Sequence, residues 1–231
     1  MRPAGLMHFP EKRIVMKNIF SPEGALFKIT ERLTNLVVLN MLYLLFCIPI
    51  ITIGPATAAL HYVTLKYAAN EEDRVWVPFF HSFKQNLKQG ILVGLVTTAV
   101  GVFLGFDLYW IYQMVNSGQA FDKVVLVLVS LACIIYLMMT AYIYPLLARY
   151  DNSLKQMFRT ALILAIRHLP ATVCLAVISA APILLLMYTP TTFMLTLSFY
   201  VFIGFAAIAF LHDKLINRIF WQYTPRETTE E

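Results

Sequence analysis

The chain has 231 residues, of which 59% are hydrophobic and only 13% are charged, and its mean hydropathy is +0.69. Soluble globular domains carry about 25% charged residues, so the composition excludes an ordinary soluble domain. The formal net charge is +5. Because basic residues just outside apolar segments are typical of cytoplasmic anchoring, nucleic acid is not a predicted partner.

The distribution of charge predicts several membrane-spanning helices. No Asp, Glu, Lys or Arg occurs in three stretches, from Leu33 to Leu65, from Val124 to Ala148 and from His168 to His212. A fourth stretch, from Ile91 to Val115, is interrupted by Asp107 alone. A spanning helix needs about 20 apolar residues. The sequence therefore predicts an all-α, polytopic membrane helix bundle.

The same pattern predicts one domain. Residues 25–221 form the transmembrane helical domain, and residues 1–24 and 222–231 are expected as flexible segments. The first residues are too polar, and the first apolar run is too long, for a cleavable signal peptide. We expect that run to remain as an anchor, and Met16 is an alternative start.

The Lys and Arg residues decide between five and six membrane segments, because cytoplasmic loops retain such residues and exported loops lose them. If Leu33–Leu65 crosses once, the two sides carry seven and eleven basic residues. If it turns back at Pro49–Pro55, seventeen lie on one side and Lys123 alone on the other. Gly and Pro also favour a turn there. We therefore predict six segments, with five as the alternative, and both termini in the cytoplasm.

The returning arm, Ala56–Ala69, is short for a span. As a helix it rises about 21 Å against a hydrocarbon core of about 30 Å, so a tilted or re-entrant half-span is expected. The break before it is interpreted as a plain turn, with a broken helix that lines a binding site as the alternative. The residues of that candidate region are Pro49, Thr52, Gly54, Pro55, Thr57 and His61.

Three similar stretches precede the predicted hairpins: FKITER from Phe27, SFKQNLK from Ser82 and SLKQMFR from Ser153. Each holds two basic residues at i and i+4, which share one face of a helix. This repetition predicts three helix-plus-hairpin units. The favoured role of the pairs is contact with anionic lipid headgroups, and the alternative is a docking surface for a cytoplasmic partner. The pairs are Lys28 and Arg32, Lys84 and Lys88, and Lys155 and Arg159.

Few polar groups are expected at membrane depth. Asp107 precedes Tyr109 and Trp110, which is typical of the outer interface. His61 is the better candidate for a buried polar group, although a packing role is favoured. The histidines lack metal-ligand spacing, and no catalytic motif is present. We predict no metal, no cofactor and no enzymatic activity.

Small residues predict where helices approach closely. Gly94, Gly101 and Gly105 recur at spacings of seven and four, which favours a close helix crossing on that face. The three cysteines lie in separate apolar segments and are expected as reduced packing residues; they are Cys47, Cys133 and Cys174.

Two segments carry a resemblance to a known family. LNMLYLLFCIPIITIGPATAALHYV, from Leu39 to Val63, and FFHSFKQNLKQG, from Phe79 to Gly90, resemble the YesL-like membrane proteins of bacteria. The resemblance extends over most of the chain and brings no catalytic signature. It implies a place in the bacterial cell membrane and a role alongside carbohydrate-utilisation systems and their ABC-type importers.

Two functions follow as hypotheses. The first is a non-catalytic accessory or regulatory partner of a carbohydrate ABC-type uptake system. Its expected contacts are anionic lipids, an ABC transporter permease or another membrane protein, and a second copy of the chain. The alternative is a small transporter or channel, for which Thr52, Thr57, His61 and Asp107 are the polar candidates.

Overall fold

The computed structural model describes residues 25–71, 74–115, 120–150, 153–186 and 189–220, and these ranges form helices and no strands. The all-helical prediction is confirmed for them. The two expected terminal segments, residues 1–24 and 222–231, lie outside the described residues.

The first apolar run folds back on itself. Helix α2 (Ala25–Cys47) is followed by a short 3-10 turn, η1 (Ile50–Thr52), and by α3 (Ile53–Ala69). The Arg32 guanidinium donates to the Asn70 side-chain oxygen at 2.6 Å, which joins the start of α2 to the end of α3. The predicted reversal is therefore present. It lies at η1, where the Thr52 hydroxyl donates to the carbonyl oxygens of Phe46 and Pro49.

Helix α3 is the central element. It packs against α4 (Trp76–Gln85), α5 (Leu87–Val115), α6 (Ala120–Arg149) and α10 (Phe205–Phe220). Most of its residues from Gly54 to Tyr67 are buried. Pro55 falls in the first turn, where proline costs no intrahelical hydrogen bond. The chain leaves α3 through Asn70, whose positive φ of 57° is typical of a helix C-cap.

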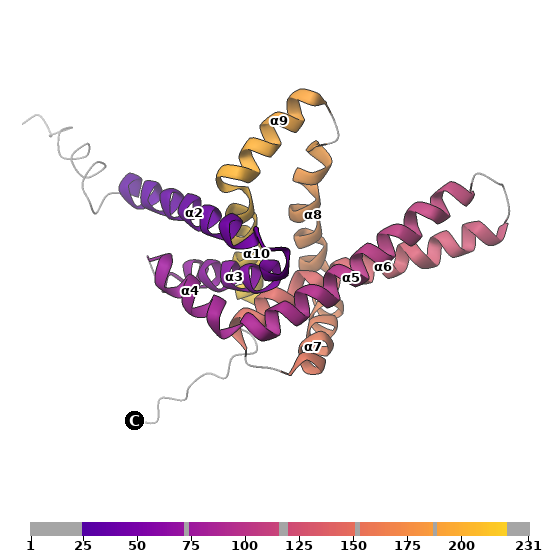
Figure 1. Cartoon of the computed structure of the whole chain (residues 1–231), viewed down its shortest axis with the longest axis horizontal. Coiled ribbons are helices and arrows are strands. Elements are labelled where there is room, and N and C mark those ends of the chain that lie inside the picture. The colour runs from indigo at the N-terminus through magenta and orange to yellow at the C-terminus, as the bar shows by residue number, and fades with distance from the viewer. Residues whose placement is uncertain (1–24, 72–73, 116–119, 151–152, 187–188, 221–231) are drawn as a thin grey trace, which may run out of the picture.

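Helices α5 and α6 form a long arm that leaves this core. In Figure 1 the arm projects to the right, and its outer part contacts no other labelled helix. Large apolar side chains are exposed along both helices, among them Phe103 and Phe106 on α5 and Val127 and Leu131 on α6. The arm is thus a helical hairpin with an apolar surface, of the kind that lipid or another membrane helix covers.

Two of the three predicted units share one design. Helix α4 meets α5 at a break at Asn86, and α7 (Leu154–Arg167) meets α8 (Leu169–Leu186) at a break at His168, with a bend of 102°. In the first unit the corresponding stretch, FKITER from Phe27, is part of α2 itself, so no break separates it from the hairpin. The break at Asn86 also corrects one expectation, because Lys84 and Lys88 lie on two helices and not on one continuous face.

Of the six basic residues in the predicted pairs, five have described side chains and all five are exposed, namely Arg32, Lys84, Lys88, Lys155 and Arg159. The side chain of Lys28 lies outside the described part. Exposure leaves both predicted roles, lipid contact and partner docking, open for these side chains.

The last span contains a local widening of the helix. Helix α9 (Pro190–Phe199) runs through a π-helical turn, η2 (Tyr200–Gly204), into α10. The buried Asn40 of α2 donates to the carbonyl oxygens of Tyr200 and Val201 at 3.0 and 2.7 Å and accepts from the Ala206 amide at 3.1 Å. One side chain therefore satisfies backbone groups that the π turn frees, and such turns recur at functional sites.

Four described helical stretches are long and apolar enough to span a membrane, and the bent α7–α8 pair raises the number to five. Helix α3 has 17 residues, about 25 Å of rise, and is shorter than a full crossing. The described residues therefore contain at most five candidate spans, which is the lower of the two predicted numbers. The chain is a multi-pass membrane protein by these spans.

Candidate functional site

A cavity of ≈ 540 Å³ lies where α2, α3, α6, α8 and α10 meet. Its wall is mostly apolar, as in many small-molecule sites. The polar side chains that line it are Tyr43, Thr57, His61, Thr140, Tyr144, Ser179, Tyr200 and His212. The π-helical turn contributes Tyr200, so the widened part of the last span forms part of this wall.

The polar end of the cavity joins α3 to α10. The His61 Nδ1 atom lies 2.9 Å from each carboxylate oxygen of Asp213, a residue 152 positions away in the sequence. The hydroxyl of Thr64, one turn along α3 from His61, donates to the same carboxylate. Asp213 is fully buried, so its two oxygens depend on these partners. The contact fixes the register between the two helices.

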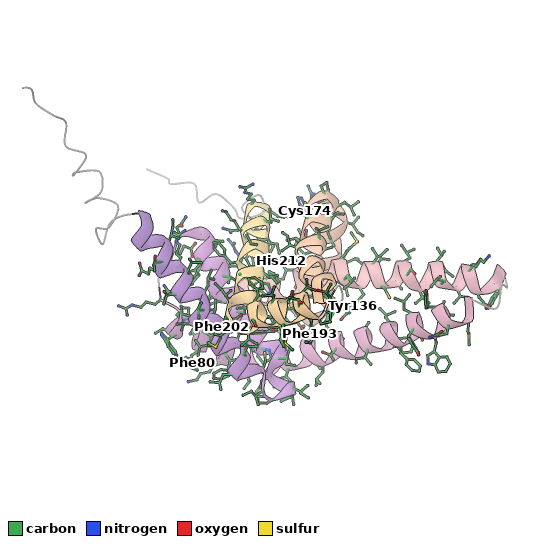
Figure 2. All side chains as sticks on the ribbon, turned by 90° about the horizontal axis from the view of Figure 1, so that it is seen from above. Phe80, Tyr136, Cys174, Phe193, Phe202 and His212 are labelled. Atoms are coloured by element: carbon green, nitrogen blue, oxygen red, sulfur yellow. The ribbon has the colours of Figure 1, made fainter. Side chains whose placement is uncertain are left out.

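His212 is the second imidazole at this end. Its ring lies 5.8 Å from the His61 ring between centroids, and only 5% of its surface is exposed. Its Nδ1 atom is buried and has no hydrogen-bond partner among the described residues. Figure 2 shows His212 in the middle of the bundle. Leaving a buried polar atom unpaired costs about 1–3 kcal/mol, so such an atom calls for a ligand or another explanation.

The sequence analysis singled out neither His212 nor Asp213. His212 is the last residue of a long uncharged stretch, and Asp213 follows it directly. The signal that was available is helical periodicity. Ala206, Ala209, Asp213, Ile216 and Phe220 recur at three or four residues and are all buried. Asp213 therefore belongs to the buried face of an amphipathic helix.

The residues of the predicted break region divide into two groups. Thr57 and His61 line the cavity. Pro49 and Thr52 form the turn at η1, and Gly54 and Pro55 contact α5. The C-terminal part of the predicted region therefore faces a cavity, whereas the break itself lies outside the cavity wall. Whether the region binds a ligand stays a prediction. Asp107 lies half-buried on the arm and does not join the cluster.

The packing glycines also differ from one another. An added Cβ at Gly94 would lie 2.9 Å from the Gly54 Cα, and one at Gly101 would lie 2.6 Å from the Tyr136 hydroxyl oxygen. Both glycines therefore lie at helix contacts. At Gly105 an added Cβ would meet nothing within 4 Å, so the expectation of a crossing there is wrong for contacts within the described chain. The spacing predicts one face, but at Gly105 that face is exposed, although α6 still contacts the neighbouring Leu104.

Gly90 also lies at a close helix contact, although the spacing pattern did not include it among the packing glycines. A Cβ on Gly54 would lie 2.0 Å from the Gly90 carbonyl oxygen, and a Cβ on Gly90 would lie 2.8 Å from backbone atoms of Pro55. Gly90 and Gly94 are separated by four residues, the spacing of small residues that lets membrane helices touch through their backbones. This crossing holds α5 against α3 next to the cavity.

Chemically, the cluster offers two imidazoles and one carboxylate at the polar end of a mostly apolar cavity. One ligand atom from each of His61, His212 and Asp213 can be chosen so that all three lie within 4.8 Å of one another. Such a set can bind a cation or hydrogen-bond a small polar ligand. Buried ionisable residues in membrane bundles commonly mark functional sites.

Comparison with known proteins agrees with the resemblance seen in the sequence. The family model described as "Protein of unknown function, DUF624" matches residues 36–108. The chain is 26% identical to uncharacterized protein YesL of Bacillus subtilis over 85% of its own length and 90% of that protein. It is 25% identical to uncharacterized protein YteU of the same organism over 72% of its own length and 75% of that protein. No solved structure matches the chain. Residues 36–108 therefore match the DUF624 family model, and the chain is distantly homologous to YesL and YteU over most of its length.

Proposed function

We propose that the protein is a non-catalytic subunit of the bacterial cell membrane that acts as an accessory or regulatory partner of a carbohydrate ABC-type uptake system. The observation that carries this proposal is the α5–α6 arm. Its helices are long enough to cross a membrane. In the 18-residue apolar segment of each helix, however, the share of buried residues is 0% for α6 and only 11% for α5. The inner ends of both helices pack on the core, but the outer part of the arm contacts no other labelled helix and leaves its surface for lipid or for another membrane protein.

The chemistry of the arm favours a protein partner. Helices associate in membranes through close packing, because lipid tails already satisfy apolar side chains. Gly105 gives α5 an open, small-residue position beside exposed Val102 and Phe106. A helix of the permease subunit would approach closely there, and the carbohydrate system is the partner that the family resemblance suggests.

In-membrane photo-crosslinking tests this proposal. A photoreactive amino acid at Val102 is expected to yield an adduct with the permease subunit, and Gly105→Leu is expected to abolish the adduct without lowering the yield of folded protein. The same photoreactive residue at the exposed Val77 of α4 is the matched control. Adducts with lipid alone at Val102, together with normal sugar uptake in cells that lack the gene, would contradict the accessory role.

The cavity supports a second candidate, a small transporter. The polar cluster at the end of an apolar cavity and the π-helical turn in its wall are features found at substrate sites in membrane bundles. The purified chain alone would then move a solute into liposomes, and His61→Ala would abolish that movement. Liposomes that show no flux with mono- and disaccharides or with protons, while the arm crosslinks to a permease, would favour the accessory role.

A further inference from the structure

We infer that His61, His212 and Asp213 form a binding site for a divalent transition-metal ion of the Zn²⁺ type, with an open coordination position toward the cavity. The proposal does not depend on the accessory role, because the three residues lie in the core and not on the arm. It rests on two independent observations: the position of the three side chains and the unpaired nitrogen of His212.

The geometry suits one ion. The chosen ligand atoms of the three residues all lie within 4.8 Å of one another, and His61 and Asp213 are already 2.9 Å apart. Two ligands of a tetrahedral Zn²⁺ ion are separated by about 3.3 Å, given metal–ligand bonds of about 2.0–2.1 Å. Small side-chain rotations would therefore bring all three atoms around a common centre. Helix α3 supplies one ligand, and α10 supplies two adjacent ones.

The unpaired nitrogen points to a missing ligand. His212 is buried, lines the cavity and has an Nδ1 atom without a partner in the described ranges. A histidine that served only to fill space would leave a polar atom desolvated with no compensation. A metal ion that binds one nitrogen of this ring orders the imidazole and offsets its desolvation.

The ligand types select the class of metal. Imidazole nitrogen suits Zn²⁺ and its first-row neighbours, whereas Mg²⁺ and Ca²⁺ prefer sites made of oxygen atoms. The Thr64 hydroxyl holds the Asp213 carboxylate in place, which is the kind of outer hydrogen bond that orients metal ligands. Three protein ligands leave a fourth position, and the lining histidines place it on the cavity side. A water molecule or a small anionic ligand would occupy it.

The test uses the full chain, purified in detergent without a polyhistidine tag. Cys47, Cys133 and Cys174 are replaced by Ser and His8 by Ala, so that these residues do not bind the metal. After stripping with a chelator and adding Zn²⁺, elemental analysis is expected to find one Zn²⁺ per chain. Zn²⁺ is also expected to raise the melting temperature, and Mg²⁺ is expected to leave it unchanged.

Variants separate this site from other zinc-binding positions. His212→Ala and Asp213→Asn are each expected to weaken Zn²⁺ binding by at least about tenfold and to remove the thermal shift. His81→Ala, at an exposed histidine of α4, is the matched control and should bind like the parent chain. His212→Ala removes the unpaired nitrogen and leaves the His61–Asp213 contact, so it is the variant expected to stay folded.

Two results would overturn the proposal. One is a parent chain that retains no Zn²⁺ at micromolar concentrations of the ion. The other is equal Zn²⁺ affinity in His212→Ala and His81→Ala, since binding would then take place elsewhere. If Asp213→Asn does not fold, the comparison of His212→Ala with His81→Ala still decides the matter.

Discussion

The core around α3 and the α5–α6 arm are both built from apolar helices but are held in different ways. In the core, backbones touch at Gly54 and Gly90, and buried polar side chains such as Asn40 and Asp213 link distant helices. In the outer arm, α5 and α6 contact mainly each other. Hydrophobicity alone does not separate these regions. Specific close contacts fix the core, whereas the outer faces of the arm are left to lipid or a partner.

The largest effect is expected at the backbone crossing of the core. Gly54→Ala places a Cβ against the Gly90 carbonyl oxygen, and because neither helix backbone has room to move, we expect a loss of about 4 kcal/mol or more in the free energy of unfolding. Gly105→Ala on the arm is the matched control and should stay within about 0.5 kcal/mol. Denaturation in detergent measures both. Equal stability of the two variants would mean that the crossing at Gly54 is not formed.

A smaller effect is expected at the π-helical turn. Asn40→Ala removes three hydrogen bonds to the backbone of η2 and α10, and we expect a loss of about 2 kcal/mol. Ser198→Ala, in the same broken span, removes only a bond to the carbonyl of its own helix and serves as control. The melting temperatures of the two variants provide the comparison. A neutral Asn40→Ala would show that the π turn does not need this side chain.

The smallest effect is expected from a single hydroxyl. Tyr142→Phe removes the contact of 2.9 Å between the Tyr142 and Thr172 hydroxyl oxygens, which joins α6 to α8 in the core. We expect a loss of about 1 kcal/mol, since Thr172 keeps its bonds to backbone carbonyls. Tyr109→Phe, at an exposed position of the arm, should leave stability unchanged. A larger loss at Tyr109 than at Tyr142 would reverse the distinction between the two regions.

The sequence predicted features that depend on local pattern. Apolar runs gave the helical membrane class, Pro49–Pro55 located the reversal to within a few residues, and the repeated SFKQN and SLKQM stretches located α4 and α7. These signals are short in range, so one sequence carries them. The exposure of Gly105 on the outer part of α5 follows from tertiary packing and has no local signal.

The candidate site was less predictable, because it depends on pairs distant in the chain. His61 was singled out, but its partner Asp213 lies 152 residues later, and Asn40 meets its partners 160 or more residues later. No local rule pairs such positions. Periodicity along α10 was the signal that could have placed Asp213 on the buried face of the helix.

If α2 and α3 form a hairpin around which the core assembles, both ends of that hairpin lie on one side of the membrane, and cysteine labelling in intact cells can show this. Single cysteines at Arg32, Asn70 and Thr191 in a cysteine-free background would be treated with a membrane-impermeant reagent. We expect positions 32 and 70 to be both protected, because the native residues are partners in one hydrogen bond, and position 191 to be labelled. Labelling of position 70 with protection of position 32 would show that the first run crosses only once and that the hairpin is wrong.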